Sequence, residues 1–584
     1  MTNRNRKWAA LVFAGALCSG CGPKAAGPPP LYAVVRFENL SGDPALEWMG
    51  LAASEVLSQS LAGAMDGPVI APAAVRRLNA TLGPRPAGAP GVSADRTAAQ
   101  LAGANHIITG YVERTAGALR VTGTEMNIAT GKAVRSVTVV DSSPLNALTG
   151  LAHTFSPRAG KFQTSSEAAL RLYCTGREGP PEAVVTSLEQ ALQADPQFGP
   201  AWEALIEFQV ARGDRPAAEA LLAKAREQHL DKLTVANLDL ETAVLHGDLK
   251  GRLVALKQIA ALSPGDTVLL RSLAESESAA GQFAESAADW RKLREVLSTD
   301  ADVWNQLGYT LAWSGDYAGA VQAMEGYARL RPVDPNPPDS LGDVHYLYRK
   351  FKAAAAAYQQ AYAKAPQFQA GGALYKSAWA KFKAGDQAGA DADFAEFRKV
   401  RQAAGTFVLV SADWLYRTGR QKEAVAELRK ALEPGASKDA EAAGKVVIYD
   451  QLAIWELLAG DRAAAAKDAE AAGAPSSPAS VAVRFASLPS APAAEWESRA
   501  MRLMPTPEAT GLRQLALGYA LLLDGRSGNK EAALRWWKVL SDGAPATDFA
   551  LRAVYTKLKG EQPKFEVLPD PGSVSPFAAV QEKL

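Results

Sequence analysis

A dipeptide recurs along this chain at a fixed interval of 34 residues. The members of this series are Gly213-Asp214, Gly247-Asp248, Gly281-Gln282 and Gly315-Asp316. Repeats of this length form one pair of helices, which cannot bury its apolar face alone, so successive pairs stack into a solenoid. The period therefore predicts an elongated all-α array that offers an extended binding surface rather than an enclosed catalytic pocket.

The best-preserved repeat runs from Val303 to Pro332. Its aromatic, small and helix-ending residues are Trp304, Leu307, Gly308, Gly315, Asp316, Tyr317, Ala320 and Pro332. This pattern resembles the tetratricopeptide repeat, in which small residues stand where two helices cross and a proline ends the second helix. The resemblance implies an all-α superhelix over residues 158–475, and the register slips by two residues near Gly371-Gly372.

The chain beyond the array is less regular. We expect residues 476–545 to hold an irregular linker and a degenerate C-terminal helical repeat. Residues 546–584 are expected to form a tail that trails along the surface, because prolines interrupt them at Pro563, Pro569, Pro571 and Pro576.

The N-terminus has the three parts of an export signal. A basic start precedes the apolar stretch Trp8–Leu17, which is too short to span a bilayer as a helix. Residues 1–20 are therefore predicted to be a signal peptide, and residues 21–30 a Pro/Gly tether. Two alternatives stay open: a cleaved signal without lipid, and a redox pair formed by Cys18 and Cys21.

The run Cys18-Ser19-Gly20-Cys21 resembles the lipobox of bacterial lipoproteins, although Cys18 stands where leucine is usual. The resemblance implies that Cys21 is lipidated and anchors the protein to a membrane of the bacterial cell envelope. Because Gly22 rather than aspartate follows Cys21, it further implies the outer membrane, facing the periplasm.

Residues 31–157 read as a small α/β domain. An apolar strand at Leu31–Phe37 leads through the turn Asn39–Pro44 into a helical stretch, and three strands follow residue 106. The opening AVVRFENLSGDPALEWM resembles the TolB amino-terminal-like domain, with Arg36 in place of the usual proline. The resemblance implies an interaction or sensing module without catalytic residues. The turn could instead hold an anion at a helix N-terminus, although Asp43 would repel phosphate.

Within the tetratricopeptide family, ligands lie against the first helix of each pair. The corresponding places in the early units are mostly acidic: Glu203, Glu207, Glu241, Arg271 and Glu275. In the later units they are Asn305, Tyr309, Trp313, Asp343, Tyr346, Tyr375, Trp379, Phe382 and Tyr416. Aromatic rings are enriched at binding hot spots, so we predict that the later set binds a ligand. The alternatives are that the rings pack between units and that the glutamates form a solvated face.

Composition excludes several classes of function. The formal charge is only +1, without the basic excess of nucleic-acid binders, and five scattered histidines show no metal-binding spacing. We therefore expect no nucleic-acid partner, no metal, no cofactor and no enzymatic activity. The sequence favours an exported, lipid-anchored adaptor that binds a protein or peptide in the groove of the array. Alternatives are a glycan-recognising envelope enzyme or enzyme activator, and a sensor component of envelope signalling.

Overall fold

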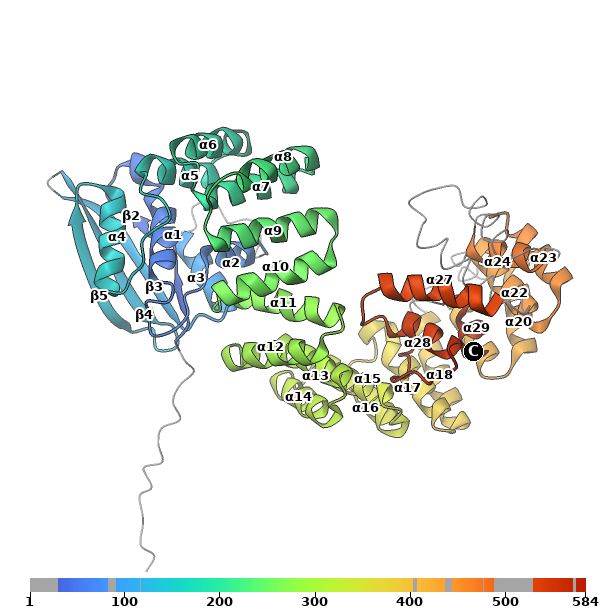
Figure 1. Cartoon of the computed structure of the whole chain (residues 1–584). Coiled ribbons are helices and arrows are strands. Elements are labelled where there is room, and N and C mark those ends of the chain that lie inside the picture. The colour runs from blue at the N-terminus through green and yellow to red at the C-terminus, as the bar shows by residue number, and fades with distance from the viewer. Residues whose placement is uncertain are drawn as a thin grey trace, which may run out of the picture.

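The computed structural model describes residues 30–81, 91–115, 117–402, 407–435, 444–475, 477–487, 529–570 and 574–583. A sheet flanked by helices comes first, and paired helices then stack into a superhelix (Figure 1). This order confirms the predicted fold class, a small α/β domain followed by an all-α tetratricopeptide-repeat superhelix.

The α/β domain is built on one five-stranded sheet. Its strands are β1 (Tyr32–Val34), β2 (Glu38–Asn39), β3 (His106–Thr115), β4 (Ala118–Asn127) and β5 (Ala133–Asp141). Strands β1 and β2 both pair parallel with β3, and β3, β4 and β5 follow one another antiparallel. Val69 adds only an isolated parallel bridge to Tyr32.

Helices cover both faces of this sheet. They are the short 3-10 helix η1 (Pro44–Leu46), α1 (Met49–Leu61), α2 (Pro72–Thr81), α3 (Gly91–Leu101) and α4 (Pro144–Phe155). Helices α1 and α4 pack together with Val112 and Val121 of the sheet, whereas α2 and α3 bury Ala33 and Ile107 on the other side. The resemblance of this region to the TolB amino-terminal-like domain stays a prediction.

The turn between β2 and η1 is held by its own polar side chains. Asn39 Oδ1 accepts hydrogen bonds from the Ser41 amide at 3.1 Å and its hydroxyl at 2.5 Å, and Asp43 Oδ1 accepts from the Ala45 amide at 2.9 Å. Arg114 pairs with Asp43 at 3.0 Å. These contacts fit a capped strand-to-helix turn better than an anion-binding loop, because the helix end already carries a carboxylate.

The array consists of successive helix pairs. The pairs are α5 (Glu167–Glu178) with α6 (Pro181–Ala194), α7 (Gly199–Ala211) with α8 (Arg215–Arg226), α9 (Lys232–His246) with α10 (Leu249–Leu262), α11 (Thr267–Ala279) with α12 (Phe283–Val296), α13 (Ala301–Ser314) with α14 (Tyr317–Leu330), α15 (Asn336–Leu347) with α16 (Phe351–Lys364), α17 (Gly372–Lys383) with α18 (Gln387–Gln402), α19 (Val408–Arg417) with α20 (Gln421–Ala431), and α22 (Lys445–Ala459) with α23 (Arg462–Ala471). In the described residues beyond these pairs lie α24 (Pro478–Ser487), α27 (Asn529–Gly543), α28 (Phe549–Leu558) and α29 (Ala578–Lys583).

The 34-residue period has a local conformational cause. Each glycine of the series ends a first helix in the left-handed region; the φ values at Gly213, Gly247, Gly281 and Gly315 are 74°, 65°, 80° and 106°. Glycine adopts this region without the strain that a Cβ atom brings. The aspartate that follows caps the second helix, because its carboxylate accepts backbone N–H bonds at α8, α10 and α14. Gln282 makes no such cap.

The next position in the series is an exception. Arg349 stands 34 residues after Gly315 and keeps the left-handed backbone, with φ of 55°. A non-glycine residue held in this conformation is strained by about 1 kcal/mol or more. The predicted register slip follows one unit later, where the short helix η2 (Phe368–Gly371) contains left-handed Gln369 and Ala370. These residues accommodate the extra length between α16 and α17.

The described part of the C-terminal segment, residues 544–570 and 574–583, packs into the array instead of forming a loose tail, so the prediction for residues 546–584 is wrong. It contains α28 and α29, and Phe565 and Phe577 are buried, at 6% and 3% exposure. Their rings join the apolar clusters of the array, because burying them there removes large apolar surfaces from water.

Several predictions lie outside the described residues. They concern the signal peptide at 1–20, Cys21, nearly all of the 21–30 tether and most of the degenerate repeat within 476–545. In the described ranges of the chain, no helix has the length and apolar character required to cross a membrane.

Candidate functional site

The C-terminal segment lies along the ends of the first helices of successive units (Figure 1). The Ala546 amide donates to the Ala279 carbonyl at the end of α11, at 2.7 Å. Further along, the Glu566 amide donates to Leu347 at the end of α15, at 3.0 Å. Lys583 Nζ finally reaches the Leu458 carbonyl of α22, at 2.9 Å. From its N-terminal to its C-terminal end, the segment therefore contacts α11, then α15, then α22, in the same order in which these helices occur in the chain.

Acidic residues of the segment meet basic residues of the array. Glu566 pairs with Arg349 at 3.3 Å and with Lys383 at 3.2 Å. Glu582 accepts a pair of hydrogen bonds from Arg417, the shorter at 2.6 Å. These cations stand at or just beyond the C-terminal ends of first helices, where the helix dipole also favours positive charge. Charge complementarity thus fixes the register of the segment on the array.

Strained Arg349 is one of the main contacts of the segment. Its guanidinium donates to the Pro563 carbonyl at 2.9 Å in addition to its pair with Glu566. The residue before it, Tyr348, meets the ring of Phe565 edge-on at 5.7 Å. Arg349, which replaces the glycine of the repeat, therefore lies where the array contacts the aromatic and acidic residues Phe565 and Glu566.

Three of the predicted groove rings are buried. Tyr346, Tyr375 and Trp379 are each exposed by 2% or less. Trp379 meets Trp414 of the next unit edge-on at 4.9 Å, and the Arg417 guanidinium lies 4.2 Å from its ring centre. In this structure these rings therefore pack within and between units instead of lining an open groove.

The predicted residues on α13 are half-buried. Trp313 lies between Tyr309, at 5.8 Å, and Phe549 of the C-terminal segment, at 5.9 Å between ring centres. Tyr309 Oη donates to Asp343 Oδ2 at 2.8 Å. Asn305 Oδ1 is buried and has no hydrogen-bond partner among the residues that the structure describes. The C-terminal segment therefore contacts the ring of Trp313, one of the half-buried rings of the predicted aromatic surface.

The remaining two rings also pack against neighbours. Phe382 meets Trp379 edge-on at 5.7 Å. Tyr416 stacks on Trp455 of the next pair at 4.2 Å and 11°. Packing between units accounts for these positions, and binding by the predicted residues stays a prediction.

A buried charge network joins the central units beneath these rings. Lys376 Nζ of α17 contacts Asp339 at 2.7 Å and Asp343 at 3.0 Å, both on α15. The hydroxyls of Tyr309 and Tyr358 each donate to Asp343 at 2.8 Å. Burial raises the pKa of Asp339, and the attraction of Lys376 opposes that rise. The network ties α13, α15, α16 and α17 together.

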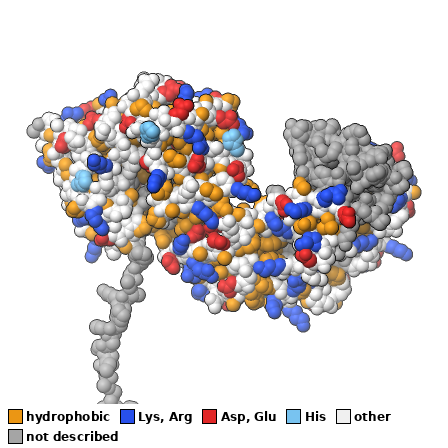
Figure 2. Space-filling model, in the orientation of Figure 1, with side chains coloured by type: hydrophobic (Ala, Val, Ile, Leu, Met, Phe, Trp, Pro, Cys, Tyr) orange, Lys and Arg blue, Asp and Glu red, His pale blue; other side chains and the backbone are white. Residues whose placement is uncertain are grey.

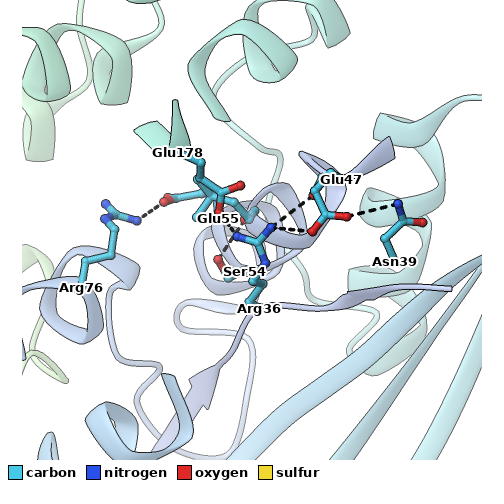
Figure 3. Close-up of polar contacts among 8 residues, drawn as sticks. Arg36, Asn39, Glu47, Ser54, Glu55, Arg76 and Glu178 are labelled. Atoms are coloured by element: carbon cyan, nitrogen blue, oxygen red, sulfur yellow. Dashed lines mark hydrogen bonds and ion pairs between the residues drawn. The ribbon is translucent and has the colours of Figure 1, made fainter. Parts of the chain in front are cut away.

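At the other end of the array, the α/β domain covers the acidic units. Arg36, which stands where the resembled domain has proline, pairs with Glu178 of α5 and with Glu47 at 3.1 Å (Figure 3). Arg76 of α2 pairs with Glu55 of α1 in the same view. Thr267 of α11 donates to the Ala102 carbonyl at 2.7 Å. The contacts of Glu178 and Thr267 join the domain to the first and fourth pairs.

A cavity of about 530 Å³ lies at this junction. Its wall combines α1 and α2 of the α/β domain with α5, α7 and α9 of the array. Glu203 and Glu207, predicted as groove positions, both line it. Arg177 of α5 pairs with Glu207 at 2.9 Å. The sequence predicted that these two glutamates face a binding surface, but it did not predict that the α/β domain forms the opposite wall.

The other positions predicted in the early units have separate surroundings. Arg271 pairs with Asp300 at 2.6 Å, and Glu275 is exposed. On the face shown in Figure 2, basic and acidic side chains are interspersed over the array. This mixture agrees with the near-zero net charge of the whole sequence.

Candidate catalytic groups were also located. His345 Nδ1 lies 2.9 Å from the Tyr317 hydroxyl, and burial lowers its pKa. Cys174 is fully buried, and burial raises the pKa of its thiol well above the usual value. Within the described part of the chain, no group of three or more His, Cys, Asp or Glu side chains could hold a metal ion.

Comparison with known proteins identifies the repeat. A model of the tetratricopeptide repeat family matches residues 178–238, from the end of α5 into α9. The comparison with curated proteins gives no match.

Several solved structures resemble part of the chain. MamA from Desulfovibrio magneticus is 16% identical, with 30% of this chain and 97% of that one covered and a TM-score of 0.26. A repeat-containing protein from Cytophaga hutchinsonii is 15% identical, covering 41% and 99%, with a TM-score of 0.32. A tetratricopeptide protein from Thermus thermophilus is 18% identical, covering 37% and 97%, with a TM-score of 0.21.

Proposed function

We propose that this protein is an exported, lipid-anchored scaffold that binds a protein or peptide partner along the ends of its first helices. The observation that carries the proposal is the docked C-terminal segment, an extended stretch of chain held by charge pairs and aromatic contacts. A partner would use the same contacts, so it would compete with the segment. The tetratricopeptide match supports a role in protein binding.

The docked segment suggests what such a partner looks like. It presents an aromatic side chain followed by a carboxylate, as Phe565 and Glu566 do, to Tyr348, Arg349 and Lys383. Buried aromatic groups supply contact area, and charge pairs at the rim choose the register. An acidic peptide with an aromatic residue is therefore the proposed ligand class. Glycan binding has less support, because Tyr375 and Trp379 are buried instead of exposed as flat platforms.

A nick in the chain tests peptide binding without removing any residue. A protease site placed at Gly560-Glu561, which is exposed, would free the segment from its covalent tether after cleavage. We expect a labelled peptide of residues 561–584 to exchange into the nicked protein. The peptide with Glu566→Lys should bind at least tenfold more weakly, because two charge pairs become repulsive.

The matched control is the peptide with Val567→Ala, since Val567 is 37% exposed and its truncation should change affinity little. The proposed binding mode would be contradicted if the Glu566→Lys peptide bound as tightly as the unmodified peptide. It would also be contradicted if no peptide exchanged into the nicked protein.

The anchor is tested separately. Cys21→Ser should leave the precursor without lipid and release the protein from membranes. Palmitate labelling that persists in this variant would rule out the proposed lipidation at Cys21.

A further inference from the structure

The cavity between the α/β domain and the array has the size and composition of a small-molecule site. Pockets that bind such ligands measure roughly 300–1,000 Å³ and combine apolar walls with a few polar groups. Here the apolar part includes Phe162, Leu233 and Leu262. Leu262 keeps 46% of its surface exposed, so part of this apolar wall is open to solvent.

Some charged side chains in the cavity wall have partners of opposite charge, and one carboxyl group does not. Arg76 is paired with Glu55, whose carboxylate also accepts a hydrogen bond from Tyr173 at 3.3 Å. Arg177 is paired with Glu207 at 2.9 Å. Both cations that line the cavity therefore already have carboxylate partners, so neither is left over for an anionic ligand.

Glu203 is the carboxyl group without a cation. Its Oε1 accepts a hydrogen bond from Asn237 Nδ2 at 2.9 Å. Among the described residues, no donor reaches its Oε2. The wall thus offers one acceptor whose natural partner is a positive charge.

We propose that this cavity binds a small organic amine with an apolar body, whose ammonium group pairs with Glu203 and whose body packs against Phe162, Leu233 and Leu262. An ammonium ion supplies the missing positive charge, and the apolar body gains from leaving water. The site draws on both parts of the molecule, because α1 and α2 come from the α/β domain and α7 and α9 from the array. It is separate from the surface that holds the C-terminal segment.

Proton release should accompany binding. Burial raises the pKa of Glu203 to about 8, against the hydrogen bond from Asn237, with Glu207 and Asp231 adding to the rise and Arg76 opposing it. The empty site therefore holds a neutral carboxyl at pH 7, and an ammonium ligand must displace its proton. Affinity should rise with pH up to about 8 and fall once the amine itself loses its charge near pH 10.

The other charged groups in the wall constrain this interpretation. Glu55 and Arg177 also face the cavity, each within an ion pair, and Tyr173 has a pKa raised above its usual value by burial. Proton release tied to Glu203 is therefore separable from theirs by substitution at Glu203 alone.

The test uses three probes with the same eight-carbon body: octylamine, octanol and octanoate. Each is titrated calorimetrically into the full-length protein at pH 7, in two buffers with different heats of ionisation. We expect octylamine to bind at least tenfold more tightly than the other two and to release close to one proton. Glu203→Gln should remove this preference, because the amide keeps the contact with Asn237 but carries no charge.

The matched control is Glu189→Gln on the exposed face of α6, outside the cavity, which should bind octylamine as the unmodified protein does. Tightest binding by octanoate would overturn the proposal in favour of an anion site at Arg76 and Arg177. Equal binding by all three probes would mean that the cavity binds only through apolar contacts, which would also overturn the proposal. Failure of all three probes to bind would overturn it as well.

Discussion

Docking of the C-terminal segment should depend strongly on Phe565. Its ring is 6% exposed and meets Phe549 edge-on at 5.2 Å as well as Tyr348 at 5.7 Å. Replacing a buried phenylalanine by alanine costs about 3–5 kcal/mol in a packed core. If the lower value applies to docking alone, Phe565→Ala raises the equilibrium constant for segment opening about a hundredfold.

Hydrogen exchange measures this opening directly. The Glu566 amide donates to the Leu347 carbonyl at 3.0 Å, so its exchange reports release of the segment. In Phe565→Ala we expect this amide to exchange about a hundredfold faster, while amides in the middle of α13 keep their rates. Val567→Ala is the control, because Val567 lies in the same segment but is 37% exposed.

Two results would refute the reasoning. Unchanged exchange at Glu566 would mean that Phe565 does not hold the segment in place. Equal acceleration in α13 and in the segment would mean that the two open as one cooperative unit, so that a partner could not displace the segment alone.

Substitutions at three other positions give distinct outcomes. Arg349→Ala and Arg349→Gly both delete the contact with the C-terminal segment, but urea unfolding should find the glycine variant more stable by about 1 kcal/mol, because only glycine relieves the left-handed backbone. Lys376→Met should destabilise the central units by about 3–5 kcal/mol in the same assay, since Asp339 and Asp343 lose their buried cation. Burial raises the pKa of Asp450 to about 6, so the folded state binds its proton more tightly and stability falls as pH rises from about 4 to 6. Asp450→Asn should remove that decline, a gain of roughly 3 kcal/mol at pH 7 measured by urea unfolding at both pH values.

The repeat architecture was predictable because its signals are local. Glycine at a left-handed helix end and aspartate at the next helix start are demands of the backbone itself, so Gly315-Asp316 carries them in the sequence. The slip near Gly371 was visible for the same reason. Small residues at helix crossings could be predicted in the same way, because larger ones do not fit there. A Cβ at Gly342 would lie 2.5 Å from the ring of Tyr358.

The covering of the array was not predictable, because it depends on contacts between distant parts of the chain. Arg349 and Pro563 are separated by 214 positions, and neither Phe549 nor Phe565 belongs to a periodic pattern. Spacing placed Trp379 on the correct helix, yet whether its ring meets solvent depends on Trp414 of the next unit. The available signal for docking was an aromatic residue, Phe565, beside an acidic residue, Glu566, in a proline-rich stretch.

The path of the C-terminal segment bears on the mechanics of the array. A solenoid in which each unit contacts only its neighbours bends like a spring, because small rotations add along its length. Here the described parts of one segment contact the array at Ala279, Leu347 and Leu458, so they connect units that are not neighbours. Connections of this kind restrict changes in the curvature of the array. Displacing the segment would therefore let the array flex, so a ligand that binds at one point would alter the shape of the molecule from α11 to α22.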